Sequence, residues 1–298
     1  MKIPIFFLGT SQAIPTAKRN HTAVLMQYKN ENILVDCGEG TQRQFRKAKL
    51  NPCRLTRLLI THWHGDHILG IPGLLQTLAL NNYNRTLYIY GPRGTRKFIE
   101  LMYRLFVQRE KIKIEVQEVN GKFLETPDFQ LEAIPLKHGP PTNAYVFQEK
   151  DKIRLDKKKL QQLKLPNSPL LKQLQTGKNI EYNNKIIKAS EVTYTEKGKK
   201  ISFILDTLLT ENCYKAAKDA DLLIAEATYA DEEKQLAKER KHLTASQSAL
   251  IAKKSKVKQL ILSHISQRYD CREDLLLSEA KKHYKNTTIA KDFDRVEV

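Results

Sequence analysis

Short apolar segments bounded by polar turns dominate the chain, and they predict strands that alternate with helices. β-forming residues predict strands at 3–8, 22–28 and 32–36, with Lys29 and Asn30 as the hairpin turn before the third. Further apolar runs predict strands at 57–61, 86–90, 111–119, 129–136, 144–148, 201–205, 222–225 and 260–263. Apolar residues at helical spacing predict helices at 68–80, 95–106, 244–253 and 273–284. Two groups of strands, each accompanied by helices, predict an α/β fold with two facing sheets between outer helical layers.

The segment 149–200 departs from this pattern. It is rich in lysine, it is interrupted by Pro166, Pro169 and Gly177, and its few leucines suffice for a helical turn or two rather than a core. We interpret it as a projecting basic arm inserted between two core strands of a single domain that spans 1–298. A disordered charged loop is the alternative interpretation.

The composition adds a strong positive charge. Of the 298 residues, 51 are Lys or Arg and 33 are Asp or Glu, which gives a formal net charge of +18. A hydrophobic content of 41% provides a sizeable core and excludes a wholly disordered chain. The acidic residues are too few to pair with every cation, so the surface should attract a polyanion such as nucleic acid or acidic lipid. A lysine-rich coding bias without a partner is the alternative, and lipid is disfavoured because nothing amphipathic accompanies the charge.

Cysteine usage and the N-terminus indicate a compartment. The four cysteines are scattered, without close pairs, which fits a reducing environment. The apolar stretch at the N-terminus is short and interrupted by Pro4, so it predicts a first strand rather than a signal peptide. No apolar run approaches the roughly 18 residues that span a bilayer. We therefore expect a cytoplasmic protein that does not span a membrane.

The strongest chemical signal follows the predicted strand 57–61. His62, His64, Asp66 and His67 lie within six residues of one another. Imidazole and carboxylate groups are ligands that suit zinc, and Gly65 lets the backbone turn tightly between them. From an extended backbone, His62 and His64 can point the same way, whereas Asp66 and His67 can turn toward a second centre. Four donors cannot complete two metal shells, so other strand ends must supply more.

Three further donors stand at the ends of apolar runs. They are His138, Asp206 and His264. A single His or Asp at a strand end is more often a capping or hydrogen-bonding residue. Three such positions together indicate additional metal ligands.

Several segments carry a resemblance to a known family. They are the opening FLGTSQAIP, the PTAKRN loop at 15–20, DCGEGTQRQ at 36–44, THWHGDH at 61–67, YGPRG at 90–94, ILDT at 204–207, AEATY at 225–229 and LSHISQRY at 262–269. On these segments the chain resembles the metallo-β-lactamase superfamily and, within it, the ribonuclease Z family of tRNA 3′-processing endonucleases. The HxHxDH spacing alone would indicate only the superfamily. The GEGTQRQ and SHISQRY segments and the PTAKRN loop narrow the resemblance to the ribonuclease Z family.

The resemblance implies a four-layer αββα sandwich of the metallo-β-lactamase type with two zinc ions per subunit. It implies seven metal ligands, one of them shared: His62, His64 and His138 on the first ion, Asp66, His67 and His264 on the second, and Asp206 on both. Two metal ions so placed generate a nucleophilic water at neutral pH and stabilise charge on the attacked phosphate.

The resemblance also implies catalytic roles outside the metal shells. Asp66 is similar to a general base that orients or deprotonates the attacking water. Glu226 would orient His242, which would donate a proton to the departing 3′ oxygen. Without the family, a surface carboxylate at Glu226 and a structural helix cap near Thr244 would explain this pair equally well.

Substrate contacts are implied at two places. Lys18, Arg19 and Asn20 resemble the loop that holds the acceptor end of tRNA, and Arg268, beside a metal ligand, could clamp a phosphate. The segment 149–200 occupies the place of an exosite that grips tRNA, and its lysines would give affinity without reading sequence. The family further implies a homodimer.

The leading hypothesis is a zinc-dependent endoribonuclease that cuts precursor tRNA after the discriminator base, leaving a tRNA 3′-hydroxyl and a 5′-phosphate on the trailer. One alternative is a related metallo-hydrolase acting on small phosphodiesters or other RNA, which should lack a long basic arm. An alternative of another class is a catalytically inactive tRNA-binding protein, which should have lost metal ligands.

Three positions depart from the family pattern. Ser168 precedes Pro169 in the arm where a Gly-Pro pair is common, which leaves the geometry of the arm's tip open. Trp63 and Leu205 stand beside metal ligands where smaller residues are frequent. We expect none of these changes to disable the metal site.

Overall fold

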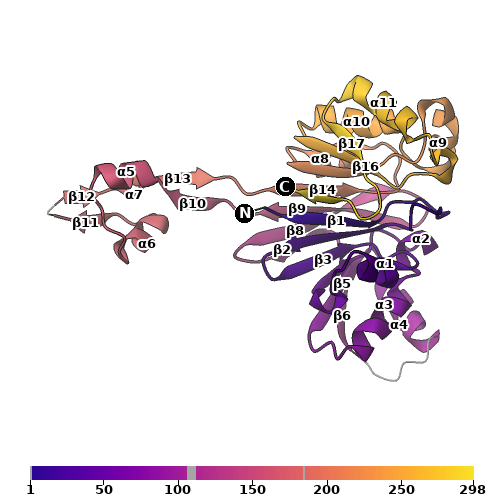
Figure 1. Cartoon of the computed structure of the whole chain (residues 1–298), viewed down its shortest axis with the longest axis horizontal. Helices are drawn as coiled ribbons and strands as arrows, with labels where there is room; N and C mark the ends of the chain where they lie inside the picture. The colour runs from indigo at the N-terminus through magenta and orange to yellow at the C-terminus, as the bar shows by residue number, and fades with distance from the viewer. Residues whose placement is uncertain (1, 106–111, 184) are drawn as a thin grey trace. The chain divides into compact units, whose positions relative to one another are not determined.

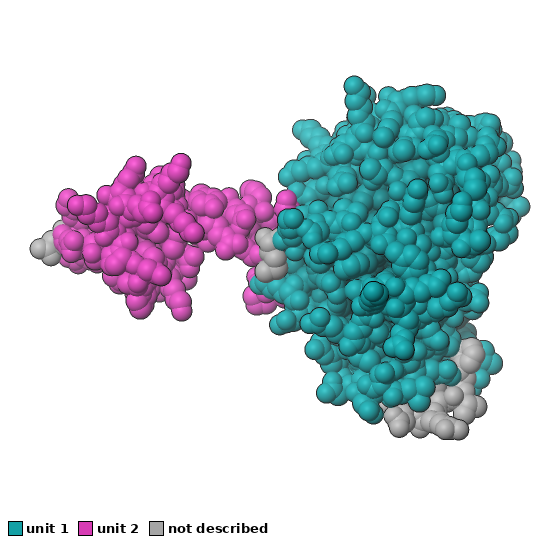
Figure 2. All heavy atoms as spheres, viewed as in Figure 1, with its two compact units in different colours: residues 1–125, 131–147, 200–298 teal, residues 126–130, 148–199 magenta. Residues whose placement is uncertain are grey.

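The computed structural model describes residues 2–105, 112–183 and 185–298. Phe106 and Lys111, which bound a predicted helix and a predicted strand, lie outside the described residues, as does Asn184 in the arm. The chain divides into two compact units, coloured separately in Figure 2. Unit 1 comprises Met1–Glu125, Leu131–Phe147 and Lys200–Val298, and unit 2 comprises Thr126–Gln130 and Gln148–Lys199.

The first sheet of unit 1 has seven strands in the order β18-β1-β2-β3-β4-β5-β6. The four strands from β18 to β3 pair antiparallel, and those from β3 to β6 pair parallel. Their bounds are β1 Pro4–Gly9, β2 Ala23–Tyr28, β3 Glu31–Val35, β4 Arg57–Leu59, β5 Thr86–Gly91, β6 Lys113–Glu118 and β18 Arg295–Glu297.

The second sheet also has seven strands, in the order β17-β16-β15-β14-β9-β8-β7. Their bounds are β7 Gly121–Glu125, β8 Phe129–Lys137, β9 Pro141–Glu149, β14 Lys200–Ile204, β15 Leu222–Glu226, β16 Gln259–Ser263 and β17 Thr287–Ile289. The run from β14 to β17 is parallel. Within this run, β15 lies between β14 and β16 and is buried along its whole length, as expected for a parallel strand covered on both faces.

Helices cover the outer face of each sheet, as Figure 1 shows. Outside the first sheet lie α1 Thr41–Lys47, α3 Ile71–Leu80 and α4 Thr95–Leu105, and outside the second lie α8 Glu211–Ala217, α10 Ala245–Lys254 and α11 Glu273–His283. Each set packs into its own apolar cluster. The α/β sandwich with outer helical layers that the sequence predicts is therefore confirmed.

Aromatic side chains and backbone contacts join the inner faces of the two sheets. The Phe147 ring in β9 packs edge-on against Tyr28 in β2, with ring centroids 5.1 Å apart. The Tyr145 hydroxyl, also in β9, donates to the carbonyl of Ile60 at 2.7 Å. These contacts fix β9 against the segment that follows β4, which carries the histidine motif.

The predicted helix 68–80 is in fact two helices. The short α2, Gly65–Ile68, ends before α3 begins at Ile71. Between them, the amide of Gly70 donates to the carbonyl of Cys37, and a Cβ at Gly70 would lie only 2.0 Å from the carbonyl oxygen of Gly38. Only glycine allows this approach, so the break ties the histidine motif to the loop after β3.

Unit 2 has a small core of its own. Its elements are β10 Lys152–Leu155, α5 Lys157–Gln162, α6 Leu170–Gln175, β11 Ile180–Tyr182, β12 Lys185–Ile187, α7 Ala189–Val192 and β13 Thr193–Glu196. β10 pairs antiparallel with β13, and Leu174 and Val192 are fully buried among its apolar side chains. The described part of the segment is thus folded.

The described residues contain no helix with the length and apolar character needed to cross a membrane. The four cysteines, Cys37, Cys53, Cys213 and Cys271, are all free thiols.

Candidate metal centre

The seven predicted ligands lie where strands of unit 1 end. His62 and His64 follow β4, and His138 follows β8. Asp206 and His264 follow β14 and β16, which flank β15 in parallel register. Because parallel strands bring their carboxyl ends to one edge of a sheet, side chains at these positions converge. Asp66 and His67, in α2, complete the set.

Three residues at this edge adopt a left-handed backbone that side chains other than glycine rarely adopt. The φ angles are 58° at Asp36, 50° at Asp206 and 56° at His264. Such a conformation costs roughly 1–3 kcal/mol per residue and persists where the surroundings impose it. Here it turns the chain sharply out of a strand and aims the side chain across the edge.

The seven predicted ligands form two groups of donor atoms, and a third group joins two of them, Asp206 and His264, to His242. His62, His64, His138 and Asp206 each offer one donor atom within 4.8 Å of the others, and Asp66, His67 and His264 form a second such group. His62 Nε2 lies 2.9 Å from His64 Nδ1. The groups meet at Asp206, because His264 Nε2 lies 3.1 Å from its Oδ1 and His62 Nε2 lies 3.5 Å from its Oδ2.

A separate partner holds the second ring nitrogen of four of these histidines. The Nδ1 atoms lie near Thr61 Oγ1 for His62 (3.1 Å), Asp36 Oδ2 for His67 (2.7 Å), the Lys241 carbonyl for His138 (3.0 Å) and Thr228 Oγ1 for His264 (3.0 Å). Such partners fix the orientation of a metal-ligating imidazole and leave the opposite nitrogen free for the metal.

One buried atom tests whether this cluster fits a metal. Asp206 Oδ1 is buried, and among the described residues it makes no hydrogen bond of suitable geometry, although the Nε2 atoms of His264 and His67 lie 3.1 Å and 3.6 Å away. An orphaned carboxylate oxygen is costly unless a cation satisfies it. Imidazole nitrogens converge on the same place, and imidazole with carboxylate is a donor set that suits zinc. The residues present therefore fit a metal-binding site.

The protonation of the cluster agrees with this interpretation for His62 and Asp206, whereas burial of His67 is outweighed by Asp66, Asp36 and Asp206, which raise its pKa, so a metal would have to displace its proton. Burial lowers the pKa of His62, and the neighbouring His67 lowers it further, which keeps His62 neutral. Burial alone would raise the pKa of Asp206, but His264 and His67 hold it below its usual range. Neutral imidazole and ionised carboxylate are the forms that bind metal.

Glu226 and His242 form a pair beside the cluster. Glu226, at the end of β15, accepts hydrogen bonds from the Thr207 amide (2.7 Å) and the Thr228 hydroxyl (2.6 Å), and it lies 2.9 Å from His242 Nδ1. Burial opposes the charged imidazole, but Glu226 and then Asp206 outweigh it and raise the pKa of His242 to about 9. His242 is therefore held as a proton donor at neutral pH.

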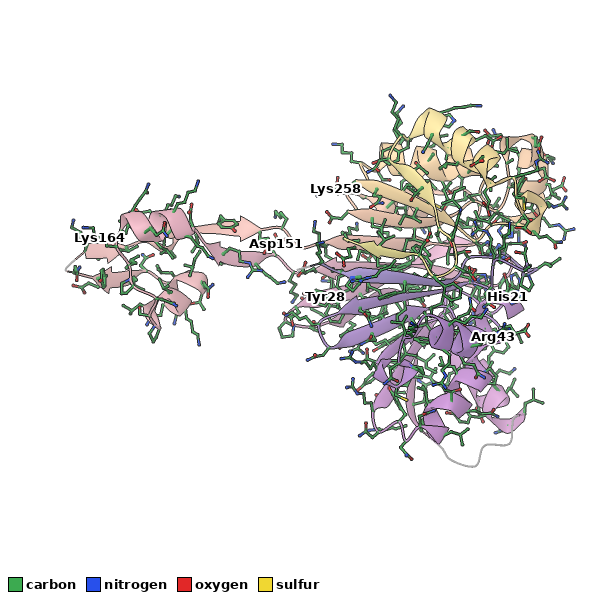
Figure 3. All side chains as sticks on the ribbon, viewed as in Figure 1. His21, Tyr28, Arg43, Asp151, Lys164 and Lys258 are labelled. Carbon is green, nitrogen blue, oxygen red and sulfur yellow. The ribbon has the colours of Figure 1, made fainter. Side chains whose placement is uncertain are left out.

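A cavity of about 680 Å³ opens over these residues. Its lining includes the ligands His64, Asp66, His138 and Asp206, together with His242. Other lining residues come from the segments 12–14 and 266–268, from Leu69 between α2 and α3, and from Leu236 and Arg240 of α9. Helix α9 spans Lys234–Arg240. His21, labelled in Figure 3, also lines it. The volume suits a ligand the size of one or two nucleotides.

The predicted substrate-binding residues have different surroundings. Arg268 lines the cavity, and its exposed guanidinium pairs with Glu233 at 3.2 Å. Lys18 is exposed, with its Nζ 3.4 Å from Cys271 Sγ. The Asn20 side chain donates to the Glu39 carbonyl at 2.7 Å.

Arg19 is buried rather than exposed to a substrate. Its guanidinium binds Glu273 at 2.8 Å and donates to the Thr10 hydroxyl and the Ala290 carbonyl, both at 2.6 Å. It thereby anchors the loop 15–20 to the C-terminal part of the chain.

Two residues that support the site are not predicted from the sequence. Asp36 binds His67 Nδ1 and accepts from the Thr61 amide at 2.7 Å, and Thr228 bridges Glu226 and His264. Asp36 does carry a signal, because it follows a predicted strand just as the ligands do. Thr228 carries none, since its role depends on two segments 38 residues apart meeting at one edge.

Comparisons with known proteins give the family. Residues 3–100 match the family described as Anti-Pycsar protein Apyc1, which covers about a third of the chain. The chain is 37% identical to ribonuclease Z of Methanosarcina acetivorans, over 99% of this chain and 97% of that protein. It is 38% identical to ribonuclease Z of Methanothermobacter thermautotrophicus, over 99% and 96%.

Solved structures agree with this relationship. The short form of human tRNase Z is similar with a TM-score of 0.71 and 28% identity, covering 98% of both chains. A metallo-β-lactamase fold protein from Bacillus subtilis, with a TM-score of 0.71 but only 19% identity, covers 100% of this chain and 99% of its own and supports the fold. On its fold and on its full-length identity with these curated relatives, the chain belongs to the ribonuclease Z family of the metallo-β-lactamase superfamily.

Proposed function

We propose that this protein is a zinc-dependent endoribonuclease that removes the 3′ trailer from precursor tRNA by hydrolysing the phosphodiester after the discriminator base. One observation carries the proposal. A complete set of seven metal-type ligands converges beside a buried Glu-His pair, in a chain that is 37% identical to a ribonuclease Z over nearly its whole length.

Two zinc ions would be held, one by each group of donors. His62, His64 and His138 would hold one, Asp66, His67 and His264 the other, with Asp206 shared. When bound, such a pair lowers the pKa of a water toward neutrality and stabilises the charge on the attacked phosphate. The chain itself supplies the imidazoles, the ionised carboxylates and the partners that orient them.

The proton transfers fall to residues at the cavity. Asp66 lines it. Burial opposes its charged form, but the imidazoles of His67 and His264 outweigh burial and lower its pKa, so it is ionised and can orient the attacking water; it can take the proton because a bound zinc pair would lower the pKa of that water. As the water oxygen bonds to phosphorus, the bond from phosphorus to the 3′ oxygen breaks, and His242 donates a proton to that oxygen. The products are a tRNA 3′-hydroxyl and a trailer 5′-phosphate. Glu226 orients His242 and stabilises its charge.

Recognition of the tRNA would rest on charge. Lys18, Asn20 and Arg268 would contact phosphates near the cleavage site, with Arg19 holding the loop from beneath. The segment 149–200, most of which lies in unit 2, would act as the tRNA-binding exosite, because exposed lysines on α5 and elsewhere in it offer sequence-independent phosphate contacts.

Two alternatives are weaker on specific grounds. A phosphodiesterase for small molecules or other RNA does not account for a folded, lysine-rich unit 2. An inactive tRNA-binding protein does not account for seven ligands in metal-binding positions with an orphaned buried carboxylate oxygen.

The family resemblance also leads us to expect a homodimer that acts in the cytoplasm. Light scattering on the purified protein should give twice the mass of one chain. A single-chain mass at micromolar concentration would contradict this expectation.

Cleavage of a precursor tRNA that carries a 3′ trailer tests the main proposal. We expect a single cut after the discriminator base, abolished by a chelator and restored by zinc, because the buried donor cluster needs a cation. Sequencing of both RNA ends gives the position and the chemistry of the cut. No chelator-sensitive cut near the discriminator would overturn the proposal.

The Asp66→Ala variant should lose this cleavage while it still binds tRNA measurably, since binding rests on other residues. Electrophoretic mobility shifts with the uncut precursor measure binding. Turnover equal to that of the unaltered protein would refute the role of Asp66.

The His242→Ala variant tests the proton donor. Loss of a general acid should lower kcat on RNA by about 10²–10⁴-fold. The loss should be much smaller with a p-nitrophenyl phosphodiester, because p-nitrophenolate departs without needing a proton. His283→Ala, on α11 and outside both the metal cluster and the cavity over it, is the control. An equal loss on both substrates would mean that His242 supports the metal site instead.

Removal of the end of unit 2 tests the exosite. Leu155 and Thr193 are paired in β10 and β13, so an Asn-Gly turn can replace residues 156–192 without disturbing the hairpin. We expect at least roughly 10-fold weaker tRNA binding, with a smaller salt dependence, since phosphate contacts are lost. Hydrolysis of the small phosphodiester should persist. Equal loss of both activities would indicate a structural role for this segment.

A further inference from the structure

A second groove reaches the proton donor from the other side of α9. It has a volume of about 630 Å³ and is lined by Leu208, Leu209, Lys234, Gln235, Lys238, His242 and Gln247. None of the seven predicted metal ligands is among its lining residues, but His242 lines both this groove and the cavity over the metal cluster. His242 thus lines two spaces of different chemical character.

Helix α9 forms the ridge between the two spaces. Leu236 and Arg240, four residues apart, line the metal cavity, whereas Lys234 and Lys238, also four apart, line the second groove. Residues offset by two positions lie about 200° apart around a helix, so the two pairs occupy opposite faces. After α9, Lys241 adopts a left-handed φ of 59°, which turns the chain so that His242 lies beneath the ridge.

The groove has the chemistry of a nucleotide site. Lys234 and Lys238 are exposed, and no carboxylate partner is seen for either in the part of the chain that the structure describes. Opposite them, Leu208 is half-buried and Leu209 is 37% exposed, which provides an apolar wall. Two cations suit a phosphodiester backbone, and an apolar wall suits the face of a base.

The groove is also close to the reacting atoms. Its leucines follow Asp206 by two and three residues, and the intervening Thr207 donates its amide to Glu226 at 2.7 Å. The same carboxylate lies 2.9 Å from His242 Nδ1. The groove wall and the proton donor are therefore held by one carboxylate.

We propose that this groove binds the nucleotides immediately 5′ of the scissile phosphate and so sets the direction in which the RNA strand crosses the active site. The inference rests on the proposed function, in which His242 gives its proton to the 3′ oxygen of the last tRNA nucleotide. That oxygen must lie within hydrogen-bond reach of His242, so its sugar lies on the α9 side of the phosphate. The trailer then continues into the metal cavity, toward Ile14 and Leu69.

The test uses a double variant, Lys234→Gln with Lys238→Gln, and synthetic precursor substrates. In these substrates neutral methylphosphonates replace phosphates either just 5′ of the cut or in the trailer. The matched control, Lys281→Gln with Lys282→Gln, removes two exposed charges from α11. Thermal unfolding midpoints verify that both variants fold.

For the unaltered protein, neutralising the phosphates on the 5′ side should raise KM. The double variant should show a raised KM for the native substrate, no further increase from the 5′-side methylphosphonates, and full sensitivity to the trailer-side ones. The slope of log KM against log salt should fall by about 1.4, the value for two contacts to a single strand. The control should match the unaltered protein in each measurement.

Three results would overturn the inference. In the first, the KM of the double variant still rises fully with the 5′-side replacements. In the second, the KM of the double variant becomes insensitive only to the trailer-side replacements. In the third, the control variant behaves like the double variant. Absence of any cut by the unaltered protein would instead refute the proposed function, so the two failures are distinguishable.

Discussion

The carboxylate of Asp206 is the constraint on which the site depends. It is buried two residues after the end of β14, its backbone is left-handed, and one of its oxygens makes no hydrogen bond among the described residues. Donor groups from β4, β8, α2 and β16 meet at it. Such a concentration of lone pairs is unfavourable in a protein interior unless a cation occupies its centre. The rest of the sandwich serves to hold these strand ends at one edge, and it can do so because parallel strands with buried apolar runs align there.

Much of the fold could be predicted from sequence because its strands are apolar and bounded by turns. The runs at 201–205, 222–225 and 260–263 became β14, β15 and β16 with nearly the predicted bounds. Other elements carry weaker signals. α1 has the sequence TQRQFRK, in which Phe45 is its one apolar side chain, so no helical period is visible. The break between α2 and α3 depends on a close approach to Gly38, which lies in a distant segment. The order within unit 2 depends on a few scattered leucines that share a core only once folded.

The site could be predicted to the extent that its chemistry lies in the ligand residues themselves. A dense His and Asp motif, with further donors after apolar runs, is sufficient to name the seven side chains that the structure brings together. The supporting groups are different, because Thr228 and the Lys241 carbonyl acquire their roles only through tertiary proximity. Arg19 illustrates the same limit. A cation in a Lys-Arg-Asn loop resembles a substrate contact in sequence, and only the positions of Glu273 and Ala290 make it a buried anchor.

The strand order has a consequence for synthesis of the protein. β1 pairs on one side with β2 and on the other with β18, which is synthesised after every other described strand. The guanidinium of Arg19 likewise can bind Glu273 and the Ala290 carbonyl only after those residues have been synthesised. Until β18 is synthesised, the nascent chain therefore exposes an open sheet edge and an unanchored loop, and exposed edges invite pairing with other chains. A sheet completed by so late a strand reaches its final strand order only in a late step of folding.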